Sequence, residues 1–329
     1  MVRVRGIALV LVACACSAAA LYWVFGDISI GAVWRERHRV RLDVYAWVYP
    51  VSGAGFLSLA WRLRILAALQ TQMPWLTSIR AVFAGYLGNA ALPVRAGEVI
   101  KAAYIARQSA LPFGTALGWI AVERVVDLCC LLLCALWIIP WVMGKSALGG
   151  GVYIFLALTA CGVTCVVIAT LRPMWMRAVM TLLLSTLGAR ISGWLRPKAD
   201  NFLDGLSALA GGRRAGLLLL STLLYWVSTL LTMQIWLAAF DLHTPWYGSV
   251  LLLAFLAFGT ALPAAAAYIG TYHFAVVAAL GVLGVAKERA AALAVFVHAA
   301  GIIPWALVAV ILLSAAFKRG ELPTHVPRG

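Results

Sequence analysis

Residues 115–141 read TALGWIAVERVVDLCCLLLCALWIIPW, and only Glu123, Arg124 and Asp127 among them carry charge. A helix of about 20 apolar residues crosses the hydrocarbon core of a bilayer, so this run is long enough to span it. In the whole chain 64% of the residues are hydrophobic and 11% are charged, whereas about 25% are charged in a soluble domain. These features exclude a soluble globular domain, a disordered chain, a coiled coil and a collagen. They predict an all-α polytopic membrane protein.

Further apolar blocks follow along the chain. They cover residues 6–25, 44–61, 75–92, 151–171, 215–240, 249–262, 273–285 and 290–317. Two of the blocks run into a proline, Pro93 or Pro263, and a short apolar stretch follows each. Because proline interrupts helical hydrogen bonding, we expect two re-entrant hairpins that are broken at mid-membrane depth. The chain then forms a single membrane domain, 1–329, with about six full spans and two broken hairpins.

The two breaks occupy matching places in the chain. GNAALP at 88–93 resembles GTALP at 259–263, and each break follows two long spans and precedes one. Three full crossings in each half make the second half enter the membrane from the opposite side. We therefore expect an inverted repeat with halves at about 1–143 and 150–317, and interrupted segments at matching positions are typical of a transport site.

The positive charge, formally +15, fits membrane topology better than nucleic-acid binding, because the arginines lie beside apolar runs. With both termini in the cytoplasm, the inside segments contain more than twice as many lysines and arginines as the outside segments. Arg62 and Arg80 count among these inside cations. The segment 172–214 interleaves apolar and basic residues, which predicts helices in the cytoplasmic interface. The run 6–25 resembles a signal peptide but is too long, so we expect an uncleaved span in a bacterial-type inner membrane.

Two groups of charges lie within or beside the apolar runs and form the first candidate site. Its residues are Asn89, Pro93, Arg95, Gly97, Glu98, Lys101, Glu123, Arg124 and Asp127. Glu123 and Asp127 share a helix face, Arg124 can pair with Asp127, and the six charged residues sum to zero. Each charge at the bilayer centre costs at least about 2.5–3.5 kcal/mol, which favours a functional role. Arg95 and Lys101 could donate to a lipid phosphate; the alternative is that the charges only pin helices together.

The second break supplies a different set of candidate residues. These are Pro263, Tyr268, Gly270, Thr271, Tyr272 and His273. If a helix restarts near Thr271, its free N–H groups and positive dipole end favour an anion. The alternative is that the tyrosines and the histidine are interfacial packing. We expect His298, inside the last span, to be a helix-to-helix hydrogen-bond partner rather than a proton relay.

The motifs of soluble catalysis are missing from the sequence. It has no P-loop, GxGxxG, GxSxG or HExxH motif, and all seven cysteines lie in apolar runs without metal-ligand spacing. We therefore expect no catalytic residue, no cofactor and no metal site.

The motifs at both candidate sites resemble those of a known family. They are Asn89-x-x-x-Pro93-x-Arg95-x-Gly97-Glu98, Glu123-Arg124-x-x-Asp127-Leu128, and Pro263 followed by Tyr268-Ile269-Gly270-Thr271. This pattern resembles the lysylphosphatidylglycerol synthase transmembrane-region family, also called flippase-like proteins. The resemblance implies an integral membrane fold and movement of a lipid between leaflets. The best-understood members of the family carry an aminoacyl-transferase domain after the membrane region. In this sequence no such domain follows the last predicted span, so we expect no lysyltransferase activity.

Three departures from the family pattern leave the substrate open. Lys101 stands where arginine is usual, an alanine run replaces a stretch richer in proline and glycine at 264–267, and His273 stands where Glu or Gln is common.

The sequence therefore predicts a transporter, not an enzyme, for an anionic or aminoacylated phospholipid or a polyprenyl-phosphate-linked glycan. One alternative is a membrane enzyme that acts on a lipid-linked substrate, with Glu123, Asp127 or His273 as acid or base. The other is a non-transporting membrane partner of a lipid or glycan pathway. The expected partners are a membrane lipid and a lipid- or glycan-synthesis enzyme, with no nucleic acid.

Overall fold

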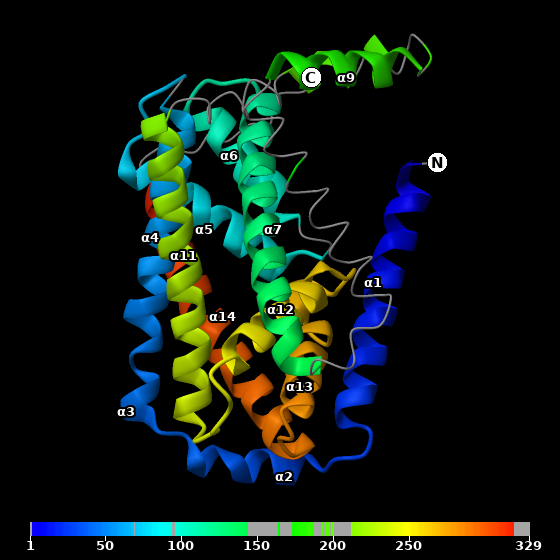
Figure 1. Ribbon diagram of the computed structural model, residues 1–329, viewed down its shortest axis with the longest axis vertical. Coiled ribbons are helices and arrows are strands. Elements are labelled where there is room, and N and C mark those ends of the chain that lie inside the picture. Colours follow the sequence, from blue (N-terminus) through cyan, green and yellow to red (C-terminus); the bar gives the residue numbers. More distant parts are fainter. Residues whose placement is uncertain are drawn as a thin grey trace. The chain divides into compact units, whose positions relative to one another are not determined.

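The computed structural model of the chain is helical (Figure 1). It describes residues 2–68, 70–93, 96–143, 173–186 and 212–318, with a few isolated residues between 164 and 200. No strand occurs in these segments, so the all-α prediction is confirmed. The predicted span at 151–171 falls almost wholly outside the described residues.

The helices begin and end close to the apolar blocks of the sequence. In chain order they are α1 (Val2–Phe25), α2 (Ile30–Arg35), the 3-10 turn η1 (Glu36–Arg39), α3 (Leu42–Tyr45), α4 (Val48–Ala67), α5 (Trp75–Ala91), α6 (Gly97–Gln108), α7 (Phe113–Met143), α9 (Pro173–Ser185), α11 (Gly212–Ala239), α12 (Gly248–Ala261), the 3-10 turn η2 (Ala266–Tyr268), α13 (Thr271–Val282) and α14 (Lys287–Lys318). At both predicted breaks a helix ends before the proline and another begins after it.

The chain divides into two compact units that interleave along the sequence. Unit 1 comprises Met1–Gly55, Phe83–Gly97 and Trp226–Ala315, and unit 2 comprises Phe56–Val82, Glu98–Tyr225 and Ala316–Gly329. The inverted-repeat halves and the single membrane domain predicted from the sequence stay predictions.

Unit 1 has an apolar core built from α12, α13, α14, the second part of α11 and the end of α1. Five consecutive residues of α14, 290–294, are fully buried, and four of them are alanines. Small side chains let helix backbones approach closely, which is typical of helices in membranes. Gly259 serves the same purpose between α12 and α13, because a Cβ there would lie 2.6 Å from the Cβ of Ala275.

Two helices in the described part of the chain are long and apolar enough to cross a membrane, Arg213–Ala239 and Lys287–Lys318. Shorter apolar helices cover Val10–Phe25, Gly248–Thr260 and Ala266–Val282. α7 has 31 residues, which is about 46 Å of helix, but its middle carries three charges. The count of six full spans therefore stays a prediction.

The predicted interfacial segment is represented by α9, which is helical as expected. Met174 and Trp175 are about three-quarters exposed, and Leu182 and Leu183 are exposed as well. An exposed apolar face is what a helix lying in a membrane interface presents, so the interfacial location stays a prediction that α9 fits.

Candidate functional site

The centre of the charged site in unit 2 is Arg62, a residue of α4 whose side chain is fully buried. Its two terminal nitrogens donate to the two carboxylate oxygens of Asp127 in α7, at 2.6 and 3.0 Å. This bidentate geometry matches the fork of the guanidinium to the plane of the carboxylate, and it is the strongest form of charged hydrogen bond. The pair therefore ties α4 to α7 where water has no access to Arg62.

A second buried ion pair lies one turn earlier on α7. Lys101 of α6 donates from Nζ to Oε2 of Glu123 at 2.5 Å, and Glu123 is fully buried. The other carboxylate oxygen of Glu123, Oε1, lies 3.8 Å from Nε of Arg62. Neither of these two atoms has a hydrogen-bond partner among the described residues, although both are buried. Glu123 therefore forms a close hydrogen bond with Lys101 and faces Arg62 at a distance too long for a hydrogen bond.

Arg124 forms the more accessible edge of the same group. Its side chain is 47% exposed and lies 3.7 Å from Glu98 and 3.7 Å from Asp127, so the predicted pairing with Asp127 is confirmed. The ring of Tyr225 from α11 lies below Arg62, with its centroid 5.6 Å from the guanidinium carbon.

We call these six charged side chains the charge network. It consists of Arg62, Glu98, Lys101, Glu123, Arg124 and Asp127. Among the described residues three cations face three carboxylates, and one of these cations is Arg62, which the set of six predicted from the sequence does not include. Arg95 falls outside the described residues. Removing one partner of a buried pair costs about 3–5 kcal/mol, because the other charge is left buried and unpaired.

The first break places Asn89 and Gly97 against each other in unit 1. Oδ1 of Asn89 accepts a hydrogen bond from the backbone N–H of Gly97 at 2.9 Å, which satisfies a free N–H at the start of α6. A Cβ at position 97 would overlap the carbonyl oxygen of Gly85 and the side chain of Asn89, so only glycine fits. Pro93, which follows α5 in the chain, is partly buried.

The second break, also in unit 1, contains unusual backbone conformations. Ala267 and Tyr268 have φ of 56° and 57°, and Gly270 has φ of 95°. A Cβ on Gly270 would collide with the carbonyl of Ser17 in α1, and the Ser17 hydroxyl accepts from the N–H of Ala265 at 2.9 Å. Non-glycine residues at positive φ carry strain that the surrounding contacts must offset, and they concentrate at functional sites.

His273 occupies the start of α13 in a way that alters the anion site predicted there. Its Nδ1 accepts from the backbone N–H of Gly270 at 3.4 Å, so the helix start is partly capped by its own side chain. The hydroxyl of Thr271 donates to the carbonyl of Tyr268 at 3.4 Å. Pro263 precedes this turn and is half-buried.

His298 of α14 connects the last long helix to the second break. Its Nε2 lies 2.8 Å from the carbonyl oxygen of Ala267. Its ring stacks on Tyr272, with centroids 4.3 Å apart, and meets the edge of His273 at 4.8 Å. As the sequence predicts, His298 is a hydrogen-bond partner between elements.

A family model described as the lysylphosphatidylglycerol synthase TM region matches residues 7–310, which include both breaks and the charge network. The chain belongs to this family. The resemblance carried by the motifs is therefore confirmed, and with it the membrane location. No curated protein and no solved structure matches the sequence of this lysylphosphatidylglycerol synthase TM-region protein.

The structure corrects one part of the sequence interpretation of this family member. The charge count from the sequence places Arg62 and Arg80 in inside segments that face water, but both lie within helices and are buried, with exposed fractions of 0% and 5%. Arg62 lies in a helix because α4 continues to Ala67, beyond the apolar block that ends at 61, and Arg80 lies within the apolar block 75–92 that forms α5. The neighbours Leu63 and Leu66 are apolar and buried, and that local pattern is the signal that Arg62 belongs to a helix.

Proposed function

We propose that the protein moves a phosphate-bearing lipid between the two leaflets, as a transporter and not as an enzyme. The observation that carries the proposal is the charge network, in which Glu123 holds Lys101 closely and Arg62 loosely. A phosphate can replace a carboxylate on a guanidinium or an ammonium, because it offers the same oxygen acceptors and at least as much charge. Each ion pair of the network is then a position that a headgroup can occupy while the helices stay packed.

Arg124 is the entry to this path in our proposal. It is the half-exposed member of the network, and its contacts to Glu98 and Asp127 at 3.7 Å are too long for tight hydrogen bonds. A headgroup that reaches Arg124 therefore displaces weaker contacts first. The candidate lipids are an anionic or aminoacylated phospholipid and a polyprenyl-phosphate-linked glycan.

The remaining parts of the proposal rest on sequence. They are the inner membrane of a bacterial-type cell, both termini in the cytoplasm, an inverted repeat with two re-entrant hairpins, the turn at 268–273 serving the opposite leaflet, and a lipid- or glycan-synthesis enzyme as partner. The two prolines at the breaks and the excess of cations in inside segments support them.

The test is leaflet exchange in liposomes that contain the purified protein. Fluorescent phosphatidylglycerol and, separately, a fluorescent polyprenyl phosphate report exchange when a membrane-impermeant reductant quenches the outer leaflet. We expect exchange with the wild type and its loss in Arg124→Gln and Lys101→Gln. Glu288→Gln is the matched control, because Glu288 is an exposed acid at the start of α14.

Two results would contradict the proposal. One is the absence of exchange for both lipids with folded wild type under an imposed proton gradient. The other is equal exchange in wild type and both network variants. A new lipid species in the mass spectrum of the liposome extract would instead favour a membrane enzyme.

A further inference from the structure

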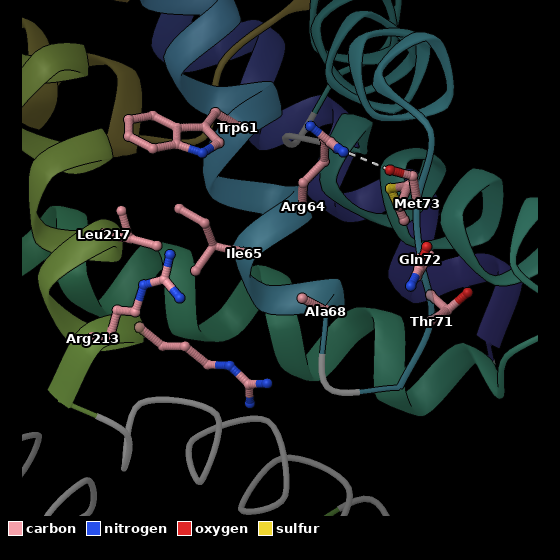
Figure 2. Close-up of a pocket in the computed structure, with 10 residues that line it drawn as sticks. Trp61, Arg64, Ile65, Ala68, Thr71, Gln72, Met73, Arg213 and Leu217 are labelled. Carbon is pink, nitrogen blue, oxygen red and sulfur yellow. Dashed lines mark hydrogen bonds between the residues drawn. The ribbon is translucent and has the colours of Figure 1, made fainter.

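Unit 2 contains a cavity of about 770 Å³ beside the C-terminal part of α4 (Figure 2). Its lining residues come from α4, the connection that follows it and the first turns of α11. They are Trp61, Arg64, Ile65, Ala68, Thr71, Gln72, Met73, Arg213, Arg214 and Leu217. We call this cavity the arginine pocket.

The described lining of the arginine pocket carries positive charge and no compensating acid. Arg64, Arg213 and Arg214 contribute three guanidinium groups, and none of the ten lining residues is acidic. Within the part of the chain that the structure describes, none of the three forms an ion pair. Arg213 and Arg214 lie in the first turn of α11, whose dipole adds further positive potential. Three like charges at one cavity favour an anion between them.

Arg64 is held in place for such a contact. Its Nε donates to the carbonyl oxygen of Met73 at 2.9 Å, as Figure 2 shows, and its guanidinium lies 4.4 Å above the ring of Trp75. These contacts leave both terminal nitrogens of Arg64 without a described hydrogen-bond partner. A guanidinium that is already oriented loses less side-chain entropy when it binds a ligand.

The arginine pocket is separate from the charge network, although both use α4. Arg62 and Arg64 are two residues apart, which is about 200° around a helix, so they lie on nearly opposite faces. The lining residues in α4 and directly after it are Trp61, Arg64, Ile65 and Ala68, and their spacing of three or four residues places them on one face of the helix.

The pocket also has an apolar side. Trp61, Ile65 and Leu217 line it, and Leu220 and Leu224 continue along α11 as exposed residues. A ligand that carries both a phosphate and an apolar body fits this combination, and basic pockets beside membrane helices bind anionic headgroups.

We propose that the arginine pocket binds a phosphate group, supplied by an anionic phospholipid whose acyl part lies along α11. Arg64 and the pair Arg213 and Arg214 approach the phosphate from different elements. The proposal goes beyond transport and does not depend on it, because the site can hold a lipid that never crosses the membrane.

The test is native mass spectrometry of the purified protein after incubation with an equal mixture of phosphatidylglycerol and phosphatidylcholine. We expect the wild type to retain phosphatidylglycerol preferentially. One cation near an anionic headgroup contributes about fivefold in affinity, so we expect about 25-fold weaker retention in the double variant Arg213→Gln/Arg214→Gln. This variant leaves the contacts of Arg64 with Met73 and Trp75 intact, so it tests the pocket without disturbing α4. Arg107→Gln, an exposed cation at the end of α6, is the matched control.

A second arm separates the two sources of phosphate. Isothermal titration calorimetry with inorganic phosphate, in a neutral detergent without lipid, measures binding of phosphate alone. Because the proposed ligand also uses its acyl part, we expect no saturable binding of inorganic phosphate. Saturable phosphate binding that is lost in Arg213→Gln/Arg214→Gln would still support a phosphate site, with a soluble source. The proposal is overturned if the wild type shows no preference for phosphatidylglycerol, or if the double variant retains as much as Arg107→Gln.

Discussion

The ion pair between Arg62 and Asp127 allows a quantitative test of the charge network. Arg62→Met removes both hydrogen bonds, at 2.6 and 3.0 Å, and among the described residues leaves Asp127 with the contact to Arg124 at 3.7 Å as its one ion pair. Charged hydrogen bonds contribute about 1.5–3 kcal/mol each, and a buried charge left unpaired costs about 3–5 kcal/mol. We expect Arg62→Met to lower the free energy of unfolding by about 3–5 kcal/mol.

The reciprocal change should cost less. Asp127→Asn leaves Arg62 buried, but Glu123 remains 3.8 Å from its Nε and partly balances its charge. We expect a loss of about 2–3 kcal/mol. In the double variant neither charge is left alone, so its loss should be smaller than the sum of the two single losses by about 2 kcal/mol or more.

The assay is unfolding of the purified protein by titration with sodium dodecyl sulfate, followed by circular dichroism. The wild type, both single variants and the double variant form a double-mutant cycle. Single losses that add within about 0.5 kcal/mol would refute the reasoning, because they would show that the two side chains do not interact in the folded protein.

Three further predictions concern the breaks and the end of α1. Gly97→Ala should abolish accumulation of folded protein, measured by fluorescence-detected gel filtration, whereas Gly216→Ala, with open space around its Cβ position, should fold normally. Lys287 donates a hydrogen bond to Asp27 and lowers the pKa of that carboxyl below its ordinary value of 3.8. The ion pair therefore contributes its full stabilisation when the pH is above 3.8, and this stabilisation is lost as the pH falls through the lowered pKa of Asp27. Asp27→Asn should flatten the acid side of the stability profile in thermal melts, and an unchanged profile would contradict the assignment. His298→Phe should keep the ring stacking but lose the backbone bond, which lowers the melting temperature by a few degrees; a wild-type melting temperature would show that the bond contributes nothing.

Local sequence signals predict the breaks in the helices well. α5 ends two residues before Pro93 and α12 ends two residues before Pro263, because proline and its predecessor resist the helical conformation. Gly270 likewise marks a backbone conformation, φ of 95°, that other residues rarely adopt. These signals act within a few residues, so one sequence is enough to detect them.

The pairing of charges is only partly predictable in the same way. Arg124 and Asp127 are three residues apart on one helix, and their contact follows from helix geometry. Arg62 and Asp127 are 65 positions apart, and their contact depends on how α4 packs against α7. Nothing local distinguishes Arg62 from a loop cation except the apolar residues beside it, so its place in the charge network requires the structure.

The even balance of the charge network has a consequence for the response to membrane voltage. The three cations and three carboxylates that the structure describes in the network carry no net charge, so a membrane potential exerts almost no net force on these six side chains when no ligand is bound. An added phosphate makes the same group of residues negative, and moving one charge across the membrane changes the energy by about 2.3 kcal/mol per 100 mV. The proposed transport of a phosphate-bearing lipid would therefore respond to voltage at the step in which the network is occupied, and not when the network is empty.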